Sequence, residues 1–211
     1  MMNNNLFIVA KYGSSYVAYS ALAFVVFYIF GFEFLATVAF FVILYFVAIF
    51  RNPERELQVF ESSSIIAPCD GVVSSIEELE DDEYRYKIEI EGSITDVGIL
   101  RSPVNGKVAN AVLTKGTKLS KRSKLFNELN EALSIEFIDE KQNSIKVVHR
   151  SKQSFVPIFS DLKESQEIIK SIRYGFATNC VTTIYLKNNV RLNVQLAQQV
   201  RAAESLIANF S

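Results

Sequence analysis

The sequence of 211 residues has no tryptophan, one histidine and two cysteines, which leaves few groups for metal or redox chemistry. Cys69 and Cys180 form no C-x-x-C arrangement and His149 has no second histidine beside it, so we predict no metal site. The 22 basic and 23 acidic residues nearly balance, and no basic stripe favours nucleic acid as a partner. Beyond Arg51 and Arg55 we expect no basic cluster that would hold anionic lipid.

Charge is also scarce near the N-terminus, where Glu33 is the single charged residue between Lys11 and Arg51. A straight helix over these 39 positions would measure about 58 Å, nearly twice the roughly 30 Å of a bilayer core. We therefore predict a transmembrane helical hairpin, with two short helices at about 16–32 and 34–50. A shallow re-entrant hairpin in one leaflet is the alternative.

The basic residues that flank this stretch predict the orientation of the chain. Lys11 precedes the first expected helix, and Arg51 and Arg55 follow the second, so a hairpin places all three on one side. By the positive-inside rule, residues 1–50 anchor the chain in the inner (cytoplasmic) membrane, and residues 51–211 form a domain in the cytoplasm. The apolar region is too long for a signal peptide and has no A-x-A cleavage site, so we expect the anchor to be retained.

The remaining sequence has the pattern of short strands separated by turn residues. The runs that we expect to be strands are 65–67, 72–76, 84–90, 107–113, 133–137, 144–148, 155–159, 181–186 and 190–196. Apolar spacing predicts two short helices among them, at about 125–133 and 161–172. The predicted fold class is α+β, mainly β, with a small antiparallel β barrel or sandwich behind the helical hairpin.

One turn motif occurs twice. Residues 67–73 (A-P-C-D-G-V-V) are echoed 35 positions later by residues 102–108 (S-P-V-N-G-K-V). Proline fixes φ before each turn, and Asp or Asn followed by Gly tolerates positive φ. The pair predicts two related half-barrels of the biotinyl/lipoyl-carrier type, and residues 198–208 are similar to the hairpin that closes such barrels. Two unrelated hairpin turns are the simpler alternative.

Several segments also match, in order, the motifs of one known family. They are Phe50–Arg55 (F-F-R-D/N-P-x-R in the family), Ala67–Gly71 (S-P-A-D-G), Arg101–Val108 (R-x-P-x-x-G-x-V), Asn127–Leu129 (N-E-R) and Ile172–Phe176 (I-R-F-G-S). Each segment is short, but together they resemble the phosphatidylserine decarboxylase family, in its short membrane-anchored bacterial and archaeal form.

The resemblance implies a pyruvoyl enzyme of phospholipid synthesis. In that family a serine in a G-S context attacks its own preceding carbonyl, assisted by an aspartate and a histidine. Asp70 occupies the aspartate position, but Gly98 stands where the histidine should be and Phe176 where the serine should be. A shifted alignment places Asn179–Cys180 at the cleavage bond, so that the thiol of Cys180 would replace the hydroxyl.

The resemblance also supplies candidate binding residues. Arg101, Asn127 and Glu128 lie in matching motifs and become candidates for binding a lipid headgroup. His149 lies in no family motif, and we expect it on the polar face of a strand. The expected partner is a membrane phospholipid, with phosphatidylserine first, while a homo-oligomer is left open.

Two hypotheses about function follow. In the first, the chain is a membrane-anchored family member without pyruvoyl catalysis, linked to phosphatidylethanolamine metabolism as a lipid-headgroup or partner-binding module. In the second, it is an active phosphatidylserine decarboxylase, a lyase with Asp70 as the base and a self-derived pyruvoyl group formed at Cys180. A scaffold that merely keeps the fold is a third class, because fold does not imply function.

Overall fold

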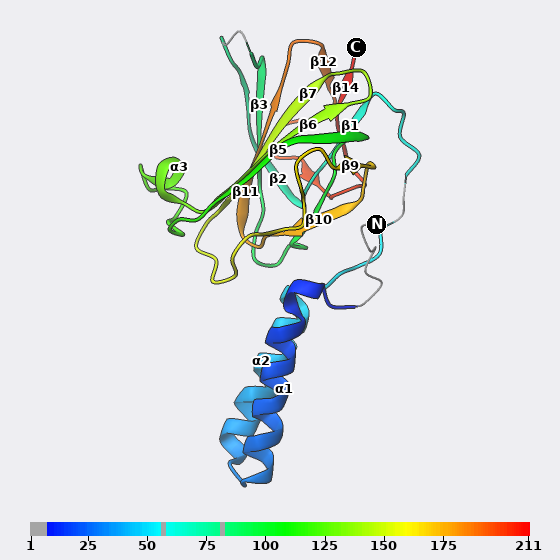
Figure 1. Cartoon of the computed structure of the whole chain (residues 1–211). Helices are drawn as coiled ribbons and strands as arrows, with labels where there is room; N and C mark the ends of the chain where they lie inside the picture. The colour runs from blue at the N-terminus through cyan, green and yellow to red at the C-terminus, as the bar shows by residue number, and fades with distance from the viewer. Residues whose placement is uncertain (1–7, 56–57, 81–82) are drawn as a thin grey trace. The chain divides into compact units, whose positions relative to one another are not determined.

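The computed structural model describes residues 8–55, 58–80 and 83–211, and the chain forms two compact units that meet in sequence between Glu54 and Arg55. The N-terminal unit is a helical hairpin, and the C-terminal unit is a β domain (Figure 1). We describe each unit by itself.

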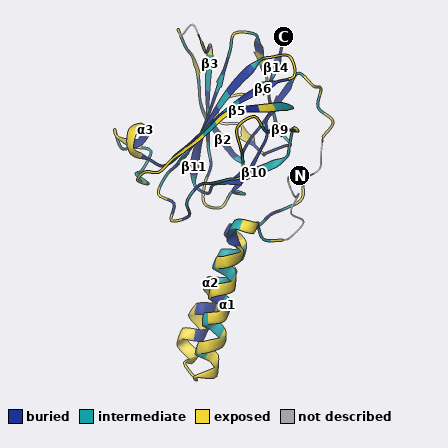
Figure 2. Ribbon diagram, viewed as in Figure 1, coloured by how far each residue is buried: buried dark blue, intermediate teal, exposed yellow. Residues whose placement is uncertain are grey.

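The hairpin consists of η1 (Lys11–Gly13), α1 (Ser14–Ile29) and α2 (Glu33–Ile49). Gly31 makes the turn with a φ of 74°, a left-handed conformation that glycine adopts without steric cost. Among the described residues, one helical stretch, Lys11–Ile29, is long and apolar enough to cross a membrane, whereas α2 is apolar but shorter. Both helices leave most of their side chains exposed (Figure 2). The helices are consistent with membrane anchoring.

The β domain is built from short strands, as the sequence predicts. The strands are β1 (Ser64–Ile66), β2 (Gly71–Glu78), β3 (Tyr86–Glu91), β4 (Ile99–Arg101), β5 (Gly106–Thr114), β6 (Ala132–Asp139), β7 (Ser144–Ser151), β8 (Phe159–Ser160), β9 (Glu167–Ile168), β10 (Arg173–Phe176), β11 (Cys180–Leu186), β12 (Val190–Leu192), β13 (Gln199–Val200) and β14 (Leu206–Phe210). The largest sheet has the order β13-β2-β3-β11-β7-β6-β5-β9, and two three-stranded sheets have the orders β1-β14-β12 and β4-β10-β8.

These pairings decide between the predicted architectures. Every ladder between the named strands is antiparallel, which confirms a mainly β, α+β fold with helices first. The strands of the described residues form open sheets and close no barrel, so the barrel form is not confirmed. The likeness to biotinyl and lipoyl carriers stays a prediction.

The two copies of the turn motif are joined by reciprocal backbone hydrogen bonds. The N–H of Ile66 donates to the carbonyl of Pro103 at 3.1 Å, and the N–H of Arg101 donates to the carbonyl of Pro68 at 2.9 Å. The two donors, Ile66 and Arg101, are 35 positions apart, and so are the two acceptors, Pro68 and Pro103. Each turn therefore makes with the other the same hydrogen bond that it receives from it.

The strands that leave the two turns are also equivalent. β2 and β5 each pair with a short edge strand, β13 and β9 respectively. The N–H of Val73 donates to Gln198 and that of Val108 to Gln166, both at 2.9 Å. The ladders on the other side of β2 and β5 shift register directly after Val73 and Val108. The internal repeat is therefore real at the level of backbone pairing, and the two turns are not unrelated.

Three local predictions need correction. The helix expected at 161–172 is wrong, because this segment makes turns around β9, with positive φ at Ser165 and Ser171. The strand expected at 155–159 is reduced to β8. The helix expected at 125–133 is present only as α3 (Phe126–Leu129), after which the chain enters β6.

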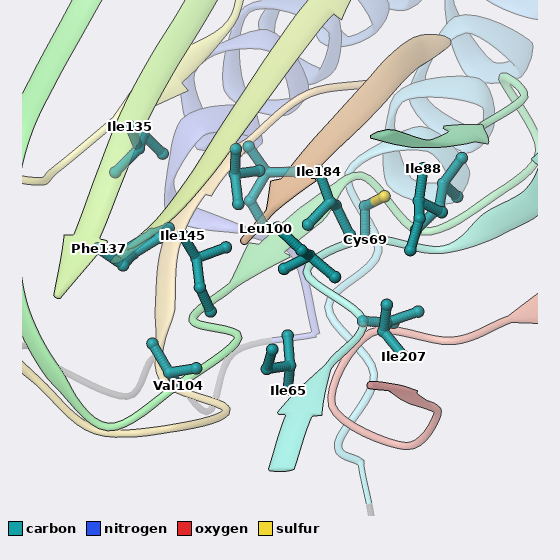
Figure 3. Packing of buried hydrophobic residues seen from close by; sticks show 14 of the residues in the cluster. Ile65, Cys69, Ile88, Leu100, Val104, Ile135, Phe137, Ile145, Ile184 and Ile207 are labelled. Carbon is teal, nitrogen blue, oxygen red and sulfur yellow. The ribbon is translucent and has the colours of Figure 1, made fainter. Parts of the chain in front are cut away.

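The core of the β domain is a cluster of aliphatic side chains from most of these strands. Figure 3 shows Cys69 among Ile88, Leu100 and Ile184, all of which are almost fully buried. This apolar interior is the environment of both cysteines, because Cys180 belongs to the same cluster.

Candidate functional site

Asp70, the candidate base, uses both carboxylate oxygens within the β domain. Its Oδ1 accepts the backbone N–H of Ala202 at 2.8 Å, and its Oδ2 lies 2.6 Å from Nη2 of Arg55. Arg55 also contacts Glu204, with 3.3 Å between Nη1 and Oε2. The side chains of Arg55 and Asp70 are only 10% and 11% exposed, so this pair is largely shielded from water. Asp70 is thus held by Arg55, where the chain enters the domain, and by Ala202, between β13 and β14.

The repeat explains one of these contacts. Asn105 is the counterpart of Asp70 in the second turn, and its Oδ1 accepts the backbone N–H of Lys170 at 2.8 Å. The two donors, Lys170 and Ala202, are 32 positions apart. The same spacing separates Gln166 from Gln198, the equivalent acceptors beside β5 and β2, so Lys170 and Ala202 are also equivalent. The Oδ1 of Asp70 therefore has a structural role that an uncharged asparagine also fills.

Gly98, at the family's histidine position, has no space for a side chain. A Cβ built there would lie 2.8 and 2.9 Å from two ring carbons of Phe176 and 3.0 Å from Cγ2 of Thr178. Phe176 is fully buried, and the following residue, Ala177, donates its N–H to the carbonyl of Gly98 at 2.8 Å. The Phe176 ring therefore fills the space that a side chain at Gly98 would enter.

Cys180, the candidate nucleophile, is the first residue of β11 and is 3% exposed. Its Sγ lies 3.8 Å from Oγ1 of Thr182. Burial raises the pKa of the Cys180 thiol to about 11, and burial together with Cys180 raises the pKa of Cys69 well above its ordinary value. Both thiols are therefore protonated at neutral pH, and a thiol is a far weaker nucleophile than a thiolate.

His149 lies in the core instead of on a polar strand face, and it is fully buried. Its Nδ1 is 2.8 Å from Oγ1 of Thr182, and its Nε2 is 2.6 Å from the hydroxyl of Tyr174. Burial lowers the pKa of His149 to about 3, so the ring is neutral. The sequence contains a signal for this position, because His149 falls in step with the core residues Ile145 and Val147 along β7.

A chain of polar groups therefore runs through the core from Tyr174 through His149 and Thr182 to Cys180. Every group in it is neutral at pH 7, and the chain satisfies hydrogen-bonding groups that burial would otherwise leave unpaired. It also connects the Cys180 thiol, through one hydroxyl, to the imidazole.

The bond before Cys180 has two further features. Asn179 adopts a φ of 47°, in the left-handed region that glycine favours, and the shifted alignment places a glycine of the family there. The Asn179 carbonyl accepts the backbone N–H of Lys152 at 3.0 Å. The positive φ of Asn179 agrees with the shifted alignment, because glycine is the residue that such a conformation favours.

A polar cavity of about 380 Å³ lies beside Asn179. Its lining residues are Glu91, Ser120, Lys121, Arg122, Lys152, Gln153 and Asn179. Nζ of Lys121 lies 3.1 Å from Glu91, and Lys152 contacts the same carboxylate. Burial opposes ionisation of Glu91, but Lys152 and Lys121 together hold its pKa below the ordinary value. The lining therefore contains three cations and one carboxylate, and Lys121 also pairs with Glu89 at 3.2 Å.

The three candidate headgroup residues lie on two elements, one in the interior and one at the surface. Arg101 in β4 is 5% exposed and donates from Nη1 to the carbonyl of Ser171 at 3.1 Å. Asn127 and Glu128 are exposed on α3, which Figure 1 shows well away from β10, the neighbour of β4. Their role in binding a headgroup stays a prediction. Among the described residues, no group of three or more His, Cys, Asp or Glu side chains is placed to hold a metal ion.

The architecture defines a class: an apolar helical hairpin followed by an antiparallel, mainly β domain. The family model described as phosphatidylserine decarboxylase matches residues 42–208. A phosphatidylserine decarboxylase proenzyme of Carboxydothermus hydrogenoformans is 32% identical over 186 residues, which cover 82% of this chain and 83% of the relative. One of Geotalea uraniireducens is 28% identical over 217 residues, with 98% of each chain covered. The chain belongs to the phosphatidylserine decarboxylase family.

Proposed function

We propose that this chain is a membrane-anchored member of the family that neither cleaves itself nor decarboxylates phosphatidylserine, and that binds a phospholipid headgroup. The observation that carries the proposal is the packing at Gly98, where the ring of Phe176 leaves no space for even a methyl group. Formation of a pyruvoyl group requires an activated nucleophile and a base beside it. At the aligned positions, a glycine and a phenyl ring supply neither.

The surroundings of Asp70 support the same conclusion. In the family pattern the aspartate orients a histidine, but here its Oδ2 is paired with Arg55 and its Oδ1 with Ala202. The one histidine of the sequence, His149, instead contacts Thr182 and Tyr174. We infer that Asp70 stabilises the turn and the linker.

The headgroup site that we propose is the polar cavity beside Asn179. Lys121, Arg122 and Lys152 supply ammonium and guanidinium groups suited to a phosphate, and Glu91 can accept hydrogen bonds from an ammonium group such as that of serine or ethanolamine. The ligand class is therefore a zwitterionic or anionic phospholipid headgroup. With the hairpin as anchor, we propose that the domain works at the inner membrane on its cytoplasmic side.

The test combines activity and binding on the full-length protein in detergent micelles. Incubation with phosphatidylserine should produce no phosphatidylethanolamine above the amount that a Cys180→Ala variant produces. Glycerophosphoserine should bind to the protein in calorimetry, and Lys152→Met should weaken that binding, whereas Lys163→Met on an exposed turn should not. Turnover that disappears in Cys180→Ala would refute the first half of the proposal, and equal binding by both lysine variants would refute the second.

A second candidate function is decarboxylation after cleavage at Asn179–Cys180. It is favoured by the positive φ of Asn179, by the N–H of Lys152 on the Asn179 carbonyl, and by the path from Cys180 through Thr182 to His149. The raised pKa of the thiol and the lowered pKa of His149 oppose it, because the base is weak and the nucleophile is protonated. The activity measurement above separates the two candidates.

A further inference from the structure

The segment that joins β5 to β6 carries a dense set of basic residues. Lys115, Lys118, Lys121, Arg122 and Lys124 lie within ten positions, and no acidic residue interrupts them. This cluster contradicts the expectation that the domain has no basic cluster for anionic lipid. The expectation relied on the nearly balanced total charge, which says nothing about how the charges are distributed along the chain. We propose that this segment, residues 115–129 including α3, is a second membrane contact of the chain, which lies on the surface of an anionic bilayer.

The charges of the segment are only partly neutralised. Lys115 pairs with Glu131 at 3.1 Å, and Lys121 pairs with carboxylates of β3. Within the described part of the chain, no carboxylate pairs with Lys118, Arg122 or Lys124, and the last two are exposed. Each basic residue near an anionic bilayer gains from its negative surface potential, so unpaired cations are the effective ones.

Apolar side chains accompany these cations. Leu125 and Leu129 are each 47% exposed and lie four positions apart, which places them on one side of α3. Phe126 points the other way, because it is 5% exposed and its ring lies 5.8 Å from the guanidinium of Arg150. Figure 2 shows α3 coloured mainly as exposed. Leucines that enter the interface between flanking lysines and arginines are the usual pattern of surface-bound segments.

The segment is held in this shape by one buried side chain. Asn130, 3% exposed, donates from Nδ2 to the carbonyls of Leu119 and Ser151 at 2.9 and 2.7 Å, and its Oδ1 accepts from Leu119 and Thr117. All hydrogen-bonding groups of this amide are thereby satisfied. Because the loop is already ordered, binding does not have to supply the free energy of ordering it.

An anionic lipid surface fits this segment better than an acidic protein does. A bilayer offers both an anionic headgroup layer and an apolar layer beneath it, which match the lysines and the two leucines. The apolar helical hairpin, once inserted, also keeps the β domain close to a bilayer and so raises the effective concentration of that partner. Lys121 and Arg122 also line the polar cavity, whereas Lys118, Lys124 and Leu125 do not, so substitutions at these three positions test the membrane contact separately from the headgroup site.

The absence of tryptophan gives a direct test with the full-length protein in vesicles. Leu125→Trp introduces the sole indole, and lipids with brominated acyl chains quench an indole that enters the interface. Vesicles of phosphatidylcholine with one third phosphatidylglycerol are compared with vesicles of phosphatidylcholine alone. Leu196→Trp is the matched control, because Leu196 is also an exposed leucine, at 65%, but lies in segment 192–200, which contains no charged residue.

We expect bromolipid to quench the indole of Leu125→Trp in the anionic vesicles, and the indole of Leu196→Trp to remain unquenched. Adding Lys118→Glu and Lys124→Glu should reduce occupancy of the surface by about tenfold or more, since each basic residue contributes to the attraction. Equal quenching in both kinds of vesicle, or equal quenching of the two indoles, would overturn the proposal. An unquenched indole in anionic vesicles would also overturn it and would favour a protein partner.

Discussion

Replacing Gly98 by alanine probes whether Phe176 has taken the space beside the family's histidine position. The new methyl group would meet the ring at 2.8 Å and Thr178 at 3.0 Å, and the fully buried ring has no solvent to move into. Forcing one extra carbon into a packed core costs about 1–3 kcal/mol. For a domain of this size, each kcal/mol corresponds to about 2–4 °C in Tm. We therefore expect Gly98→Ala to lower Tm by several degrees.

The cause is identified by a double-mutant cycle with Phe176→Leu, which removes the ring atoms that the methyl group would meet. In that background, Gly98→Ala should cost at least about 1 kcal/mol less than in the natural chain, a coupling in the range found for residues in contact. Thermal unfolding of the full-length protein in detergent, followed by circular dichroism, measures all four variants. Gly92→Ala is the control, because a Cβ there meets only backbone atoms of Asp70 and Cys180. Additive costs for Gly98→Ala and Phe176→Leu would refute the reasoning.

Three further predictions concern stability. Gly106→Ala should destabilise the domain by about 2 kcal/mol or more, measured by Tm, because its φ is 148° and a Cβ would lie 2.0 Å from the carbonyl oxygen of Ile138. The pKa of His149 is about 6.5 in the unfolded chain and about 3 in the fold, so only the unfolded chain gains a proton between these values. The free energy of unfolding should therefore fall by about 1.4 kcal/mol per pH unit as the pH drops from 6.5 toward 3, and a His149→Gln variant should lack this dependence in unfolding measured at several pH values. Arg55→Met should lower Tm because it leaves Asp70 without its cation, and Asp70→Asn should restore part of the loss; no recovery would contradict the ion pair.

The parts of the fold that were predictable from the sequence depend on local chemistry. The Pro-x-Asp-Gly and Pro-x-Asn-Gly turns were recognisable because proline and glycine restrict the backbone independently of the surroundings, and their spacing revealed the repeat. The helix expected at 161–172 failed because its capping-like residues and apolar spacing are also compatible with an edge strand. Pairing of β9 with β5, a contact between distant segments, decided the outcome.

The candidate site was less predictable, because it depends on contacts across strands. That Gly98 and Phe176 were substituted could be seen from the sequence, but that one fills the space beside the other could not. The prediction of His149 on a polar strand face was wrong, although its alternation with Ile145 and Val147 is visible in the sequence. Its contacts with Thr182 and Tyr174 follow from the pairing of β7 with β11 and from the position of β10.

The central claim, that this family member does not form a pyruvoyl group, is tested most directly by the intact mass of the full-length protein after expression. We predict one uncleaved chain of 23.8 kDa, identical in processing to a Cys180→Ala variant. Cleavage at Asn179–Cys180 would instead leave fragments of 179 and 32 residues, the second beginning with a pyruvoyl group. Those two fragments, present in the natural chain and absent from Cys180→Ala, would contradict the account.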